Sequence, residues 1–220
     1  MKTEGSPIGE AKRRSPAFRA PPARLRWSGS GTNEFKVKAD KSGLELSFQA
    51  AQVEAGASLA LAIESRSHAV PTRDVPNTKE IAQTVQVAAP REQAKRFPLS
   101  EVLWVDDRPN NNIYEQKAFE AIGLRFTLAR STEEAFSILR NRSFAAIISD
   151  MGRPPDARAG YTLLDALRSR GDRTPFIIYA SSRAPEHIKE TAEHGGQGCT
   201  NNPEELFKLV TKAIIEGPSV

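Results

Sequence analysis

The clearest indication of fold in this 220-residue chain is the stretch 144–150, Phe-Ala-Ala-Ile-Ile-Ser-Asp. It is a short, nearly continuous apolar run that ends in a carboxylate, a pattern typical of a strand buried on both faces of a parallel sheet. In open α/β sheets, ligands bind beyond the carboxyl ends of the strands. We therefore expect Asp150 to lie at a functional edge of the sheet and not in an ordinary solvated turn.

A second apolar run of the same kind, 102–105, ends in Asp106-Asp107. Neighbouring parallel strands would bring these carboxylates close to Asp150. Like charges that converge raise one another's pKa, so such a cluster favours a bound cation. Mg²⁺ takes oxygen ligands and leaves room for a phosphate, and an Asp carboxylate can itself attack a phosphoryl group. The cluster therefore predicts a Mg²⁺ site at which Asp150 presents an oxygen for attack.

From Glu101 onward, apolar runs alternate with helical patterns. The predicted strands are 102–105, 125–129, 144–149, 175–179 and 197–199, and the predicted helices are 112–122, 131–140, 161–169, 184–193 and 203–215. Five strands alternating with five helices predict an α/β fold, a (βα)₅ doubly wound sheet. Right-handed crossovers make that five-stranded sheet parallel.

In these features residues 101–216 resemble the receiver domain of bacterial response regulators, which has a CheY-like, flavodoxin-like fold. The resemblance is carried by the hydrophobic strand before Asp-Asp, by the spacing of 43 residues from Asp107 to Asp150, and by Gly160 before the third helix. It implies a signalling protein of a phosphorelay, or two-component system, whose partner is a sensor histidine kinase or another signalling protein. It implies no enzymatic activity beyond self-phosphorylation and dephosphorylation of the receiver aspartate.

The same resemblance implies a role for each residue of the cluster. Asp150 is expected to be the phosphoacceptor, and Asp106, Asp107 and Asp150 to be Mg²⁺ ligands together with the backbone carbonyl of Gly152. Mg²⁺ is the only cofactor expected.

The chain departs from the family at its switch positions. Where the family has a hydroxyl residue after strand four, this chain has Ala180, followed by Ser181, and Cys199 occupies the aromatic position on strand five. The lysine after strand five is replaced by Asn202, which donates a hydrogen bond but brings no charge. The resemblance therefore implies an intact metal site with an altered response to phosphorylation.

Several alternatives stay open. Arg153 and Arg158, in a loop longer than the family's usual one, are candidates to supply the missing positive charge. The domain is alternatively a pseudo-receiver that binds partners without phosphorylation. A less favoured interpretation is a Mg²⁺-dependent, flavodoxin-like hydrolase effector, against which no base-and-nucleophile pair is found beyond the carboxylates.

The chain before the receiver-like domain (101–220) is predicted in three parts. Residues 1–32 are rich in Pro, Ser, Gly and Arg and predict a disordered basic tail. Residues 33–65 predict a β-hairpin (33–48) followed by a helix, a small module that is marginal alone and is expected to pack on a copy of itself as a homo-oligomer, on a partner, or on the C-terminal domain. Residues 66–100 predict a linker that is partly helical and broken near Pro90.

Composition limits the remaining possibilities. The first 36 residues carry eight Lys and Arg against three Asp and Glu, whereas residues 101–220 carry fifteen against seventeen, so contact with nucleic acid is expected only through the tail. A single cysteine fits a reducing compartment, and no apolar stretch reaches the ~20 residues that span a bilayer. We expect a cytoplasmic bacterial protein whose output passes through protein contacts.

Overall fold

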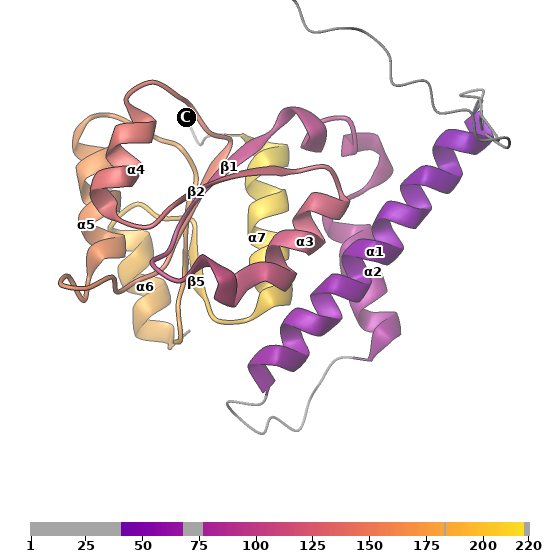
Figure 1. The fold of residues 1–220 in the computed structure, drawn as a ribbon, viewed down its shortest axis with the longest axis horizontal. Helices are drawn as coiled ribbons and strands as arrows, with labels where there is room; N and C mark the ends of the chain where they lie inside the picture. The colour runs from indigo at the N-terminus through magenta and orange to yellow at the C-terminus, as the bar shows by residue number, and fades with distance from the viewer. Residues whose placement is uncertain (1–40, 68–76, 183, 218–220) are drawn as a thin grey trace, which may run out of the picture. The chain divides into compact units, whose positions relative to one another are not determined.

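Five parallel strands form the centre of the protein (Figure 1). The structure, a computed structural model, describes residues 41–67, 77–182 and 184–217. The strands are β1 (Glu101–Val105), β2 (Arg125–Ala129), β3 (Ala146–Ser149), β4 (Phe176–Tyr179) and β5 (Gly198–Thr200). Their order is β2-β1-β3-β4-β5 and every neighbouring pair is parallel. The predicted (βα)₅ sheet is confirmed, and each strand lies within two residues of its predicted bounds.

Helices cover both faces of the sheet. The five that follow the strands are α3 (Ile113–Ala121), α4 (Thr132–Leu139), α5 (Ala159–Ser169), α6 (Pro185–Glu193) and α7 (Pro203–Glu216). Helices α3 and α7 lie on one side of the sheet, and α4, α5 and α6 lie on the other (Figure 1). Because side chains alternate along a strand, Trp104 joins the core on the α3/α7 side, whereas Leu103 joins the core on the α5 side.

The register of the central strands brings two of the predicted site residues together. Val105 of β1 is paired with Ser149 of β3, so Asp106 and Asp150 leave the sheet side by side. The Asp150 amide still donates to the Val105 carbonyl, at 2.9 Å. Asp106 and Asp150 therefore lie together at the carboxyl ends of β1 and β3, as predicted.

The prediction of a β-hairpin at 33–48 is wrong where it can be compared. Residues 41–48 belong to α1 (Lys41–Ser67), a helix of 27 residues, while 33–40 lie outside the described residues. Of the alternating apolar residues that suggested a strand, Leu44, Leu46 and Phe48 lie within this helix, and Leu46 is 68% exposed. A single helix satisfies its backbone internally, whereas an isolated two-stranded hairpin is marginal, and Ala, Leu, Glu and Gln favour the helix.

Helix α1 is an integral part of the fold. Its residues Ala55, Leu59 and Ile63 are buried in the same hydrophobic cluster as Phe119 of α3, and residues 38–220 form one compact unit. Of the partners expected for the segment 33–65, the structure shows the C-terminal domain, since α1 packs on the α3/α7 side of the sheet (Figure 1).

Much of the predicted linker is also ordered. Helix α2 (Thr78–Ala88) begins at a capping box formed by Asn77 and Glu80, and it ends just before Pro90, as expected. Two short 3₁₀ turns, η1 (Arg91–Gln93) and η2 (Phe97–Leu99), lead into β1. The predicted tail at 1–32 lies outside the described residues. None of the described helices is long and apolar enough to cross a membrane.

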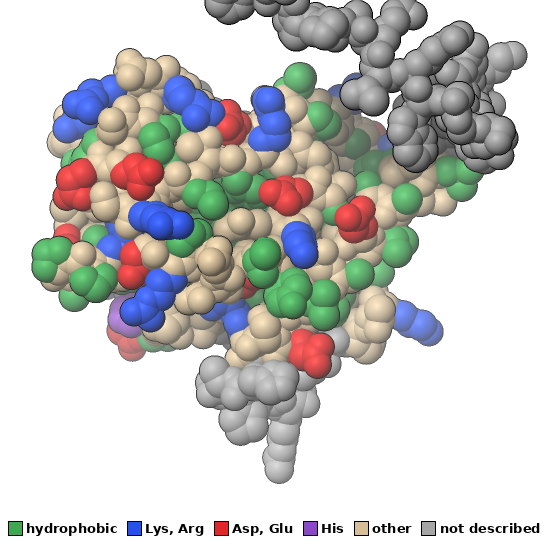
Figure 2. Space-filling model, viewed as in Figure 1, with side chains coloured by type: hydrophobic (Ala, Val, Ile, Leu, Met, Phe, Trp, Pro, Cys, Tyr) green, Lys and Arg blue, Asp and Glu red, His purple; other side chains and the backbone are tan. Residues whose placement is uncertain are grey.

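Charged side chains of both signs are interspersed over the face of the molecule shown in Figure 2. Among the described residues, this face presents no continuous basic patch of the kind that binds nucleic acid.

Candidate functional site

Three aspartates converge where β1 and β3 end. One carboxylate oxygen each from Asp106, Asp107 and Asp150 lies within 4.8 Å of the others. Asp106 is buried, and the other two are partly exposed. All three residues were predicted for this cluster, and the structure brings them together.

Backbone and side-chain donors fix the two deeper carboxylates. The Arg108 amide donates to Asp106 Oδ1 at 2.6 Å, and Asn112 Nδ2 donates to Asp106 Oδ2 at 2.7 Å. The Met151 amide donates to Asp150 Oδ1 at 2.7 Å. Among the described residues no partner occupies Asp150 Oδ2, so this oxygen is available for chemistry.

Electrostatics at Asp150 favour a cation. Burial raises the pKa of its carboxyl above the usual range, and the neighbouring Asp106 charge raises it further. The Met151 hydrogen bond and the Arg153 guanidinium oppose this shift in pKa without cancelling it. A divalent cation would offset both causes, because it neutralises the converging charges. The carboxylate donors are the hard oxygen ligands that Mg²⁺ prefers, so the residues present fit this ion.

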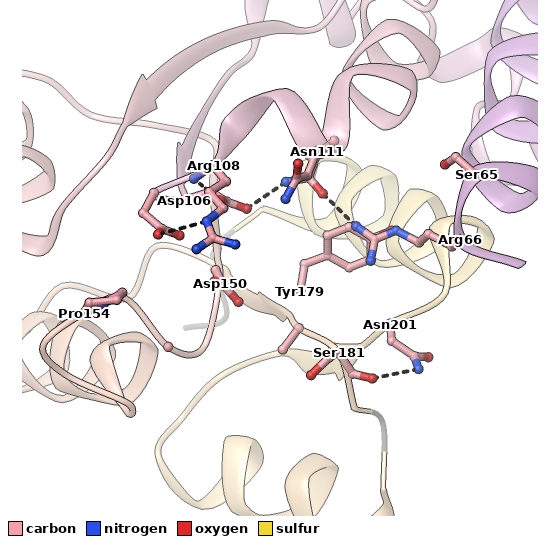
Figure 3. A pocket seen from close by; sticks show the side chains of 14 residues that line it. Ser65, Arg66, Asp106, Arg108, Asn111, Asp150, Pro154, Tyr179, Ser181 and Asn201 are labelled. Atoms are coloured by element: carbon pink, nitrogen blue, oxygen red, sulfur yellow. Dashed lines mark hydrogen bonds and ion pairs between the residues drawn. The ribbon is translucent and has the colours of Figure 1, made fainter. Parts of the chain in front are cut away.

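The cluster lies in an open pocket of about 720 Å³ (Figure 3). The other lining residues are Ser65, Arg66, Arg108, Asn111, Asn112, Gly152, Pro154, Tyr179, Ala180, Ser181 and Asn201. Gly152, the predicted backbone ligand, is among them. The pocket thus has acids on one side and several uncharged hydrogen-bonding groups around them.

Gly160, at the start of α5, allows the chain to pack closely behind the cluster. A Cβ atom there would lie 2.8 Å from Ile178 Cδ1 and 2.9 Å from the Asp150 carbonyl oxygen. Distances that short would force the backbone after β3 to move. A residue without a side chain is therefore required for Asp150 to keep its position.

The switch positions are divided between the pocket and other parts of the fold. Ala180 and Ser181 line the pocket. Asn202 does not, because its Oδ1 accepts from the Glu205 amide at 3.0 Å and so caps α7. Its neighbour Asn201 lines the pocket instead and donates to the Ser181 carbonyl at 3.2 Å. Cys199 is buried in the core on the α5 side.

Neither arginine suggested as a substitute for the missing lysine lines the pocket. Arg153 is 4% exposed, and its Nη1 donates to the Asp150 carbonyl at 2.7 Å and to Ser149 Oγ at 2.8 Å. Burial lowers the pKa of its guanidinium. Arg158 pairs with Glu190 at 2.5 Å on the surface. Among the described residues, the cations that line the pocket are Arg66 and Arg108.

Sequence reasoning missed a polar group beside the acids. Arg66, at the end of α1, pairs through Nε with Oε1 of the buried Glu115, at 2.8 Å. Tyr179 donates to the same oxygen at 2.7 Å, and the Arg66 guanidinium lies over the Tyr179 ring, 4.2 Å from its centroid. Burial and the Glu115 charge raise the pKa of Tyr179, which keeps its hydroxyl protonated as a donor. A lone arginine at the boundary of a predicted linker gave no signal of this role.

Comparison with known proteins identifies this arrangement. Residues 102–214, which contain the sheet and the acidic cluster at its carboxyl edge, match the family model described as the response regulator receiver domain. The matched segment is half of the chain. The chain therefore belongs to the response regulator receiver family, and its role is in signalling.

Individual proteins that match this chain share about a quarter of its residues over the aligned segment. A gliding motility regulatory protein of Myxococcus xanthus is 27% identical over 136 residues, which are 61% of this chain and 17% of that protein. This chain thus spans about a sixth of the length of that relative. Among solved structures, a Francisella response regulator receiver domain (25% identity, TM-score 0.49) covers 53% of this chain and 98% of its own. The chemotaxis response regulator CheY4 of Vibrio cholerae (25%, 0.46) covers 52% and 98%.

Proposed function

We propose that this receiver domain binds Mg²⁺ at Asp106, Asp107 and Asp150, with the Gly152 carbonyl as a further ligand, and accepts a phosphoryl group on Asp150. The observation that carries the proposal is the convergence of three carboxylate oxygens within 4.8 Å in an open pocket at the strand ends. The donor is a sensor histidine kinase or another phosphorylated signalling protein. We assign this function to the cytoplasm, whose reducing conditions suit the free thiol of Cys199.

The proposed chemistry is the transfer of a phosphoryl group from the donor to the Asp150 carboxylate. Asp150 Oδ2 attacks phosphorus, an O–P bond forms, and the bond from phosphorus to the donor breaks, so that the donor atom keeps the electron pair. The Met151 amide holds the other oxygen of the same carboxylate and so orients the nucleophile. Bound Mg²⁺ would supply the positive charge that screens the phosphoryl oxygens during transfer.

The test is Mg²⁺-dependent labelling of the full chain with acetyl phosphate, followed by intact mass measurement. We expect one added phosphoryl group in the wild type, none in Asp150→Asn, and strongly reduced labelling in Asp107→Asn. Asp165→Asn is the matched control, because Asp165 is an exposed carboxylate on α5 that pairs with His194. Labelling that survives in Asp150→Asn would place the acceptor elsewhere.

A second candidate function is favoured by the switch positions. Ala180 has no hydroxyl to contact a phosphoryl oxygen, and Asn202 is engaged as the cap of α7. A pseudo-receiver that binds its partner without phosphorylation would have this combination. This second function predicts that the phosphorylated and the unphosphorylated chain bind a partner equally, and that Asp150→Asn leaves that binding intact.

A further inference from the structure

The buried Glu115 carboxylate joins α1 to the receiver fold. Glu115 is 1% exposed, and a buried carboxylate costs several kcal/mol unless it is paired and hydrogen-bonded. Among the described residues, Arg66 is the cation that meets it, and the Tyr179 hydroxyl is its second donor. Arg66 lies outside the segment 102–214 that matches the family. The receiver therefore contains a buried charge whose partner is supplied by a helix from outside the family's boundaries.

Asn112, the last residue of the 3₁₀ turn η3 (Pro109–Asn112), connects this pair to the acidic cluster. Its Oδ1 accepts from Arg66 Nη2 at 2.6 Å, and its Nδ2 donates to Asp106 Oδ2 at 2.7 Å. Asn112 is 2% exposed, so water does not compete freely for these contacts. Arg66 and Asp106, the two ends of this chain of contacts, are labelled in Figure 3.

The chemistry of the three groups permits one orientation of the amide. A guanidinium offers only donors, and a carboxylate offers only acceptors. The Asn112 amide therefore satisfies both neighbours only with its oxygen toward Arg66 and its nitrogen toward Asp106. Asp106 alone also favours this orientation, but without Arg66 the amide loses the second contact that holds it in place against the Asp106 carboxylate.

We propose that Arg66 is a positioning residue of the metal site, acting through Asn112 to hold the Asp106 carboxylate in the orientation that binds the cation. The proposal rests on the proposed function, since it takes Mg²⁺ as the ligand of the cluster. Helix α1 is then part of the site. Because coupling between two equilibria is reciprocal, Mg²⁺ binding also strengthens the docking of α1.

The experiment measures Mg²⁺ affinity by titration calorimetry in the full chain, with Arg66→Met, Arg66→Lys and Asn112→Leu. We expect each to weaken binding by roughly 5-fold or more, the lower end of typical couplings between sites. Arg66→Lys keeps a charge for Glu115 but loses the forked contact with Asn112, so it separates positioning from simple docking. Once Asn112→Leu is present, Arg66→Lys should have no further effect on affinity.

Arg91→Met is the matched control. Arg91 forms an ion pair with Glu45 at the other end of α1 and does not line the pocket. It therefore loosens the same helix without touching Asn112, and we expect Mg²⁺ affinity to stay within 2-fold of the wild type, roughly the error of such titrations. Circular dichroism confirms that each variant folds.

A second measurement follows the coupling from the other direction. Mg²⁺ should slow amide exchange in residues 45–67 of the wild type and leave it nearly unchanged in Asn112→Leu. The inference is overturned if Arg66→Lys binds Mg²⁺ as the wild type does, or if Arg91→Met weakens binding as much as Arg66→Met. A wild type that binds no Mg²⁺ at millimolar concentration would instead refute the metal site itself, and the inference with it.

Discussion

At the scale of single residues, Asp150 lies in the site and Arg153 is buried beside it. The carboxylate lies in front of the strand ends, and the buried guanidinium lies behind them, where it donates to the Asp150 carbonyl, Ser149 Oγ and, at 3.1 Å, Thr132 Oγ1. The Arg153 charge lowers the pKa of Asp150, although burial and Asp106 keep that pKa raised. Arg153 therefore supports the acidic edge structurally and is not a contact for a phosphoryl group.

We expect Arg153→Met to destabilise the protein. The substitution leaves buried acceptors without a donor, which typically costs about 1–3 kcal/mol for each group, while it also removes the cost of burying the guanidinium. The expected net loss in the free energy of unfolding is about 2 kcal/mol, measured by urea denaturation. Arg158→Met is the control, since its ion pair is on the surface, and it should change stability little. Equal effects of the two substitutions would contradict this account of Arg153.

At the scale of secondary-structure elements, α1 differs most from the sequence-based expectation. One side of this helix carries Ala55, Leu59 and Ile63 into the core shared with α3 and α7, and the other side leaves Val53 exposed. Its C-terminal end brings Arg66 to the pocket. The helix therefore contributes both to the stability of the fold and to the surroundings of the acids.

Leu59→Ala tests whether α1 is part of the cooperative unit. Leu59 is 1% exposed, so its truncation should lower the free energy of unfolding by about 2–5 kcal/mol. Val53→Ala, at a position that is 72% exposed, should change it by less than about 0.5 kcal/mol. A single unfolding transition is expected in both variants. If Leu59→Ala left the main transition unchanged, α1 would be a separate module after all.

At the scale of the whole molecule, the proposed phosphorylation of Asp150 raises the question of how far it would reshape the fold. A ligand shifts a conformational equilibrium only by its different affinity for the two states. Ala180 offers no hydroxyl to a phosphoryl group, and Asn202 caps α7. The contacts that would pull the loop after β4 and the loop after β5 toward a phosphoryl group are therefore largely absent.

A beryllofluoride adduct on Asp150 should accordingly change amide exchange only slightly across residues 180–203 of the wild type. Introducing Ala180→Thr with Asn202→Lys should enlarge the response. Because Asn202→Lys removes the cap of α7, which typically costs about 1 kcal/mol, Asn202→Ala serves as its control. Strong protection of this segment in the wild type would contradict the prediction and would direct attention to Ser181 and Asn201, which line the pocket.

Local patterns were sufficient to predict the sheet and the acidic cluster. Each strand of the sheet is a short apolar run, and the burial of a parallel sheet on both faces requires such runs. The aspartates follow two of these runs directly, so the parallel arrangement alone places them at one edge. Gly152 and Gly160, which lie beside them, were expected only from the resemblance to the receiver family.

The position of α1 and the identity of the residues around the acids depend on contacts between distant parts of the chain. Residues 41–48 alternate in polarity and suit either a strand or a helix, and in the structure they form the first turns of a helix whose later residues are buried in the core with α3. Arg66 is 49 residues from Glu115 in the chain, and nothing in either local sequence indicates that they meet. They meet because a buried carboxylate requires a cation, and the docked helix brings one within reach.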